Sequence, residues 1–254
     1  MMSTISKQVF SQQNFIMNIA LIGYGRMGHE IETIALKRSH YVKLIIDLDN
    51  RDDLCESKLS DIDVAIEFSS PDSAFDNISR CLELSVPVVS GTTGWLENYD
   101  KAVEICMKKK TSFIHSSNFS IGVNILFRLN QELARYMAKY KDYSVSIEEI
   151  HHTKKLDAPS GTAITLAGGI IVNHQQYEKW CFEKDKADNC IPIRSLREGV
   201  VPGTHIVLWD SEIDTISLTH EAKNRKGFAL GAVVAAEFIH LKKGIFTMSD
   251  VMGF

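Results

Sequence analysis

The residues with the clearest chemical potential lie in one short stretch, from Glu149 to Ala163. It holds two adjacent histidines, His151 and His152, in a segment whose apolar residues alternate as in a strand. Neighbouring side chains on a strand point to opposite faces, so these histidines are poor partners for one metal ion. We therefore expect no metal; one histidine would face a substrate as acid or ligand, and the other would face elsewhere.

The rest of the same stretch is suited to binding a carboxylate. Lys155 supplies a point charge. The turn formed by Ser160, Gly161 and Thr162 opens a predicted helix, whose first N–H groups and threonine hydroxyl can bind an anion. A histidine alone is more often structural than catalytic, but its combination with a lysine and a helix N-terminus favours a site for an acidic substrate.

A second motif, Gly-x-Gly-x-x-Gly at residues 23–28, lies between a predicted strand and a predicted helix. Gly23 permits a tight turn, Gly25 lets the backbone approach a pyrophosphate, and Gly28 lets the helix pack close to the strand. The pattern alone can be only a tight strand–helix turn. Its context, with Asp47 at the end of the next strand, predicts dinucleotide binding.

Asp47 also indicates which dinucleotide is used. Its carboxylate can accept hydrogen bonds from the adenosine ribose, but it repels a 2′-phosphate. The three residues that follow it carry no cation, although Arg51 is near. NADH is therefore favoured over NADPH; the alternative is that Asp47 only caps a loop.

A third run of small residues, from Ser90 to Gly94, follows another predicted strand. Small side chains there would let the backbone approach the nicotinamide end of the cofactor, at the carboxyl edge of a parallel sheet. Taken alone, the run is equally compatible with an ordinary loop.

The elements that must position these residues fall into two patterns. From Met17 to about residue 121, short apolar strands alternate with helices, which predicts a parallel sheet covered on both faces. From Gly122 onwards, a long amphipathic helix and further strands, two of them an antiparallel pair, predict a mixed sheet. An apolar helix over residues 228–241 could pack back on the first part.

The predicted fold class is therefore α/β, with a Rossmann-type dinucleotide-binding domain plus a second α+β domain with a mixed sheet. The first domain would comprise residues 17–121 plus 232–254, and the second, which binds substrate, residues 122–231. A hinge near Ile121 would let the cleft close over both ligands. The polar residues 1–16 are predicted to be a disordered extension.

Composition excludes several classes of protein. A net charge of −4 argues against non-specific binding to nucleic acid, and no apolar run approaches the roughly 18 residues that span a membrane. The five cysteines form no C-x-x-C pair, which favours free buried thiols in a reducing compartment. A cytoplasmic protein is expected, because the N-terminal residues lack the apolar segment of a secretory signal.

Together these motifs resemble those of the dihydrodipicolinate reductase family, which serves the diaminopimelate route to lysine. The resemblance extends from Met17 to the C-terminus. It implies reduction of 4-hydroxy-tetrahydrodipicolinate, or dihydrodipicolinate, to tetrahydrodipicolinate with hydride from NADH or NADPH. Besides the stretches above, it rests on Phe68-Ser69 with Pro71, Ser117 to Asn124, Ser195 to Gly199, Pro202 to His205, Leu218 to Ala222, Arg225 and Phe228 to Ala232.

The resemblance also implies roles for single residues. The proton donors would be His151 and Lys155, and the substrate would contact His152, Gly161 and Thr162. Members usually form homotetramers through their C-terminal sheet domains. Cofactor contacts would fall on Gly23, Tyr24, Gly25, Arg26, Met27, Gly28, Asp47, Gly91, Thr92, Thr93, Ser116, Ser117, Asn118 and Phe119.

Two other functions stay open at this point. A non-catalytic NAD-binding regulator would retain the fold but have a damaged histidine–lysine motif, and the motif is intact. An amino-acid dehydrogenase with a similar first domain would keep the glycine loop without needing the run from Asp157 to Thr162. Arg225 could meet a substrate carboxylate or pair with a local acid.

Overall fold

The structure is a computed structural model that describes residues 15–254. The predicted extension over residues 1–16 lies outside this range, except for Phe15 and Ile16. The ring of Phe15 stacks on His240 at 4.9 Å between centroids and packs against the core of the first domain. The packed part of the chain therefore begins before Met17.

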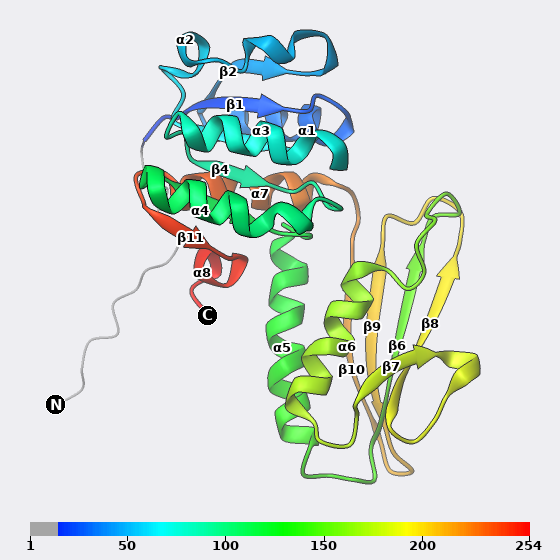
Figure 1. The fold of residues 1–254 in the computed structure, drawn as a ribbon. Helices are drawn as coiled ribbons and strands as arrows, with labels where there is room; N and C mark the ends of the chain where they lie inside the picture. Colours follow the sequence, from blue (N-terminus) through cyan, green and yellow to red (C-terminus); the bar gives the residue numbers. More distant parts are fainter. Residues whose placement is uncertain (1–14) are drawn as a thin grey trace, which may run out of the picture.

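The first part of the fold, called the first layer below, consists of a parallel sheet and the helices on both of its faces (Figure 1). Its elements are β1 (Asn18–Ile22), α1 (Arg26–Lys37), β2 (Tyr41–Ile46), α2 (Glu56–Leu59), β3 (Val64–Glu67), α3 (Pro71–Glu83), β4 (Val88–Ser90), α4 (Tyr99–Lys109), β5 (Ser112–His115), α7 (Lys226–Ile239), β11 (Gly244–Phe246) and α8 (Met248–Met252). The six strands lie in the order β11-β5-β4-β3-β1-β2. The predicted Rossmann-type sheet is confirmed.

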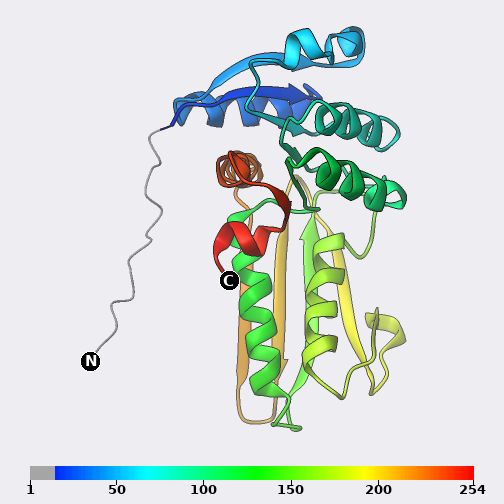
Figure 2. The same cartoon turned by 60° about the vertical axis from the view of Figure 1, so that its left-hand side comes forward.

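Alternation along the strands creates a core on each side of this sheet. Along β1, Ile19 and Leu21 pack on one side, whereas Ala20 and Ile22 pack on the other. The first side is covered by α1 and α7, and the second by α3 and α4 (Figure 2). Because both faces are buried, the strands read as continuous apolar runs.

Helix α7 joins the C-terminal segment to this first layer. Its small and apolar residues contact α1, and Arg38 donates two hydrogen bonds, of 2.7 and 2.8 Å, to Glu237. Gly231 lies directly against the backbone of Phe119: a Cβ at Gly231 would stand 1.7 Å from the Phe119 carbonyl oxygen. Only glycine permits this approach of the helix to the loop after β5.

The glycine loop lies where the strand order reverses. Strand β1 pairs with β2 on one side and β3 on the other, which makes a topological switch point, the usual ligand site of such sheets. Gly23 has φ +88°, and a Cβ there would lie 2.1 Å from the carbonyl oxygen of Phe68, just after β3. A side chain at Gly23 would therefore force the two cofactor-side loops apart.

The second layer is a mixed sheet whose helices, among residues 15–254, lie on one face. Its elements are α5 (Ile121–Met137), β6 (Ser144–His151), α6 (Gly161–Asn173), β7 (Lys179–Phe182), β8 (Cys190–Arg197), β9 (Thr204–Asp210) and β10 (Thr215–Glu221). The order is β10-β9-β6-β8-β7, with β9 antiparallel to its neighbours and β6, β8 and β7 parallel. The predicted mixed sheet is confirmed, although β7 and β8 were not expected.

Helices α5 and α6 cover one face of this sheet, and within residues 15–254 no helix covers the other (Figure 1). Buried and half-buried residues alternate along β6 and β9 accordingly. Among the helices that the structure describes, none is both long enough and apolar enough to cross a membrane.

The cysteines differ from the sequence-based expectation of free buried thiols. Cys181 and Cys190 form a disulfide, because β7 and β8 lie side by side and bring their Cα atoms to 5.9 Å. Cys55 is free but half-buried, and only Cys81 and Cys106 are both free and buried. The expectation is therefore wrong for three of the five.

Candidate active site

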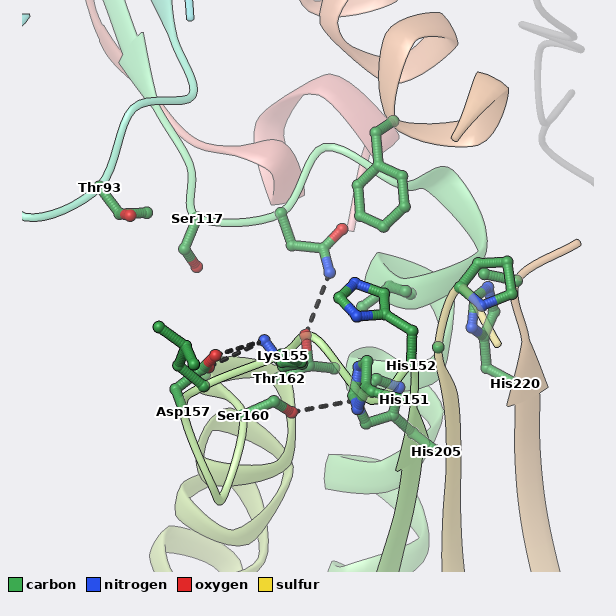
Figure 3. Close-up of a pocket in the computed structure, with 18 of the residues that line it drawn as sticks. Thr93, Ser117, His151, His152, Lys155, Asp157, Ser160, Thr162, His205 and His220 are labelled. Carbon is green, nitrogen blue, oxygen red and sulfur yellow. Dashed lines mark hydrogen bonds and ion pairs between the residues drawn. The ribbon is translucent and has the colours of Figure 1, made fainter. Parts of the chain in front are cut away.

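A cavity of about 740 Å³ lies between the two layers. Thr93, Ser117 and Asn118 line it from the first layer, and the end of β6 with the start of α6 lines it from the second (Figure 3). Its size suits a small organic ligand. The residues predicted to be catalytic or to bind substrate all line it: His151, His152, Lys155, Gly161 and Thr162.

Both adjacent histidines face this cavity (Figure 3). Strand β6 ends at His151, so His152 already belongs to the turn that follows. The expectation that one of them would face elsewhere is wrong, because the alternation of side chains stops where the strand stops. The cavity thus receives two imidazoles from consecutive residues.

His151 is buried beside a carboxylate. Its Nδ1 lies 3.5 Å from Oε2 of Glu149, two residues earlier on the same face of β6, and its ring meets that of His205 edge-on at 5.0 Å. Burial lowers the pKa of His151, while the negative charge of Glu149 acts to raise it. Burial outweighs the carboxylate, so the imidazolium of His151 gives up its proton readily.

His205 and His220 also line the cavity, and sequence reasoning assigned neither to the site. His205 Nε2 lies 3.2 Å from Ser160 Oγ, and burial lowers its pKa to about 4. The strand pairing places His205 opposite both Glu149 and His220. Both histidines lie in motifs that the sequence analysis named, at residues 202–205 and 218–222. Placing them in the site requires the register of β6, β9 and β10, which the sequence does not show.

Lys155 holds an ion pair at the mouth of the cavity. Its Nζ lies 2.8 and 2.9 Å from the two carboxylate oxygens of Asp157 (Figure 3). Although partial burial acts to raise the pKa of Asp157, Lys155 holds it below its ordinary value. Asp157 was not predicted to be a site residue, yet it fixes the position of the ammonium group.

The start of α6 lies at the wall of the cavity. Ser160 caps the helix, with its Oγ accepting from the Ala163 N–H at 3.2 Å. N–H groups of a first helical turn have no partner within the helix, and a Cβ at Gly161 would meet nothing within 4 Å. Thr162 Oγ1 accepts a 3.2 Å hydrogen bond from Asn118 of the first layer. This turn is open to the cavity, and the bond between Thr162 and Asn118 joins it to the first layer.

A second cavity, of about 480 Å³, runs along the first layer. The N-cap of α1 is Gly25, which has no side chain to occupy the first N–H groups of the helix, so a pyrophosphate fits there. Thr93 lines both cavities. The other residues on its wall are Arg26, Met27, Gly91 and Thr92, as predicted, with Phe68, Ser69 and Pro71, which were not.

The remaining predicted cofactor residues differ in position. Gly23 and Asp47 line a smaller pocket with Arg51. Among the residues described, Tyr24, Gly28, Ser116 and Phe119 lie on no wall of these cavities. Tyr24 donates to Glu32, Gly28 packs on the Gly23 carbonyl, Ser116 donates to the Asn118 carbonyl, and Phe119 packs on Phe68.

The loop at Thr92 is fixed from two sides. Below it, the buried carboxylate of Glu67 accepts hydrogen bonds from the hydroxyls of Ser90 and Thr92, at 2.7 and 2.8 Å. The Thr92 carbonyl accepts from Trp95 Nε1 at 2.8 Å and lies 3.1 Å from His115 Nε2. His115 is therefore part of the support of this loop, and burial lowers its pKa.

Family models match both halves of the chain. Residues 17–119 match the model described as "Dihydrodipicolinate reductase, N-terminus", and residues 122–252 match "Dihydrodipicolinate reductase, C-terminus". The chain belongs to the dihydrodipicolinate reductase family. It is thus a nicotinamide-dependent oxidoreductase of lysine biosynthesis.

Relatives of this reductase support the assignment over most of its length. A 4-hydroxy-tetrahydrodipicolinate reductase of Christiangramia forsetii is 56% identical over 238 residues, covering 93% of this chain and 98% of the relative. The enzyme of the same name from Thermosipho africanus is 36% identical, with the same coverage. The solved structure of a dipicolinate-bound dihydrodipicolinate reductase from Paenisporosarcina sp. TG-14 shares the fold, with TM-score 0.74 at 24% identity, covering 92% of this chain and 98% of that one.

Proposed function

We propose that this reductase transfers hydride from NADH to dihydrodipicolinate, formed from 4-hydroxy-tetrahydrodipicolinate, and yields tetrahydrodipicolinate. The observation that supports it best is that Thr93 lines both cavities, so a nicotinamide in one would adjoin a substrate in the other. Alignment of donor and acceptor is the main contribution of a protein to such a reaction. The related enzyme from Paenisporosarcina, described as dipicolinate-bound, supports a planar dicarboxylate as the ligand class.

The residues that line the cavity have separate roles in the proposed reaction. The bound dinucleotide supplies the hydride, and the conjugated imine that receives it is left with electron density that a proton must quench. His151 delivers this proton, because its imidazole lines the cavity that holds the substrate. Lys155 and the turn at Gly161 and Thr162 bind the substrate carboxylates and orient the ring.

The experiment that tests this function follows nicotinamide absorbance with dihydrodipicolinate generated in situ. We expect rapid oxidation of NADH that depends on the substrate. Tight binding of NADH without turnover would instead point to the non-catalytic regulator. Reduction of NAD+ by an amino acid, together with no oxidation of NADH by dihydrodipicolinate, would point to the amino-acid dehydrogenase.

Lys155→Ala should weaken both substrate binding and turnover. Loss of one charged hydrogen-bonding partner corresponds to about a ten- to hundred-fold fall in kcat/KM. The KM for the dicarboxylate should rise, while the affinity for NADH stays the same, because Lys155 is absent from the cofactor cavity. Steady-state kinetics would measure this, with the exposed Lys186→Ala as the matched control. An unchanged kcat/KM would remove Lys155 from the site.

Asp47→Asn should shift cofactor preference towards NADPH. Asp47 lines its pocket with Arg51, and its side chain also accepts a hydrogen bond from the Leu48 N–H. Asparagine retains that capping bond and removes only the charge that repels a 2′-phosphate. We expect the ratio of kcat/KM for NADPH to that for NADH to rise about tenfold. The control Asp49→Asn should keep the wild-type ratio. If the ratio is also unchanged in Asp47→Asn, Asp47 only caps the loop and does not set the cofactor preference.

The proposal includes a homotetramer that works in the cytoplasm on small molecules. The face of the second sheet that α5 and α6 leave uncovered carries half-buried apolar residues, among them Ile150, Ile206 and Leu208, which suit a subunit interface. Light scattering on the purified chain would test this assembly.

In a reducing cytoplasm the Cys181–Cys190 bond would be open to reduction.

A further inference from the structure

Glu149 is a buried carboxylate to which the proposed reaction gives no role. Its side chain is fully buried in β6. Oε1 accepts hydrogen bonds from the Ser160 N–H at 3.0 Å and from Arg197 Nη2 at 3.2 Å. Oε2 lies 3.1 Å from the same N–H, 3.5 Å from His151 Nδ1 and 3.8 Å from His205 Nε2. One carboxylate therefore touches the proposed acid, the start of α6 and two neighbouring strands.

The carboxylate is ionised in this setting. Burial acts to raise the pKa of Glu149, but hydrogen bonds, led by those from Ser160 and including that from Arg197, hold it below its ordinary value. A buried charge of this kind is retained only with good partners. Because Ser160 and Arg197 bond Oε1, it is Oε2 that lies beside His151.

The contact between Glu149 and His151 is longer than an ordinary hydrogen bond. At 3.5 Å the Nδ1 of His151 makes no hydrogen bond, and it is a buried polar atom without a partner among the described residues. Hydrogen bonds between catalytic groups are often long before substrate binds and tighten in the complex. A small rotation of the ring would bring Nδ1–H within bonding distance of Glu149.

We propose that Glu149 is a positioning residue that orients His151 through Nδ1, so that Nε2 presents the proton to the cavity. Through the Ser160 N–H, the same carboxylate ties the acid to the turn that binds the substrate carboxylate. The proposal rests on the role of His151 as proton donor. A nearby carboxylate fixes which nitrogen of an imidazole carries the outward proton and stabilises the imidazolium.

The pH profile distinguishes this role from a structural one. The acid must be protonated, so the rate falls as pH rises through the pKa of His151. Removing the Glu149 charge destabilises the imidazolium and moves this fall to lower pH. The charged and titratable groups that face His151 are Glu149 on β6, Arg197 on β8, His205 on β9, and Lys155 and Asp157 on the loop after β6.

The test is Glu149→Gln in the full chain. We expect kcat/KM to fall at least about tenfold and the alkaline limb of its pH profile to move down by about one unit, with the Kd for NADH unchanged. NMR titration of the histidines should show the same shift for His151, whose signal is assigned as the one missing in His151→Gln. The matched control is Glu212→Gln, which removes a carboxylate from an exposed turn and should match the wild type.

Glu149→Asp keeps the test open if the glutamine variant does not fold. It retains the charge but reaches less far, so kcat should fall while the alkaline limb stays near that of the wild type. A wild-type limb in folded Glu149→Gln, or wild-type kcat in Glu149→Asp, would overturn the proposal. If His151→Gln itself keeps full turnover, the proposed function has failed instead, and the two failures are thereby distinguished.

Discussion

His151→Gln is expected to lower kcat by about 10²–10⁴-fold, the usual contribution of a general acid. Glutamine is similar in size and polarity, so it fills the space between β6 and β9, but it cannot transfer a proton near neutral pH. The Kd for NADH should be unchanged, because His151 lines the substrate cavity and is absent from the cofactor cavity.

Single-turnover and steady-state kinetics would measure this effect, and fluorescence titration would measure the affinity for NADH. His240→Gln, which removes a ring outside the cavity, serves as the control. Equal losses of turnover and cofactor affinity in a folded variant would argue against the role as acid.

Gly231→Ala is expected to destabilise the fold by about 3 kcal/mol or more, beyond the usual cost of overpacking. The new Cβ would stand 1.7 Å from the carbonyl oxygen and 2.7 Å from the carbonyl carbon of Phe119. Neither backbone can move cheaply, since α7 is packed in the first core and the Phe119 side chain is buried. Any movement of this loop also displaces Ser117 and Asn118 at the cavity wall.

Urea unfolding would measure the loss, and Gly168→Ala provides a matched control. A Cβ at Gly168, within α6, meets nothing within 4 Å. Alanine is the better helix former there, so this variant should be unchanged or more stable by about 0.5–1 kcal/mol. Equal stability of the two variants would contradict the argument from close approach.

The fold could be predicted wherever the pattern is local. Apolar strands that alternate with helices predicted the parallel sheet, and the antiparallel pair β9 and β10 followed from its own alternation. Strands β7 and β8 were missed because they are short or interrupted: β7 has four residues, and β8 carries Pro192 and Arg194. Their pairing also explains the missed disulfide, since it depends on two strands lying side by side.

The site could be predicted only in its contiguous parts. His151, Lys155 and the turn at Gly161 lie within one short stretch, whose chemistry shows in the residue types. His205 joins them through strand register, and no local pattern contains that information. Glu149 is the first residue of this stretch, but its contacts with α6, β8 and β9 appear only in three dimensions.

The ion pair of Lys155 with Asp157 has a consequence for selectivity. Asp157 is bonded to the ammonium group of Lys155, so if Lys155 binds a substrate carboxylate as proposed, Asp157 would compete with that carboxylate. A ligand with a single carboxylate has to displace Asp157 with little other gain. A dicarboxylate can bind the start of α6 with one carboxylate. Its second carboxylate is then held close to Lys155, at a high effective concentration, and would displace Asp157 more readily. On the proposed function, this ion pair would favour a ligand with two acidic groups over a simple anion by a modest factor, because so exposed a pair is weak.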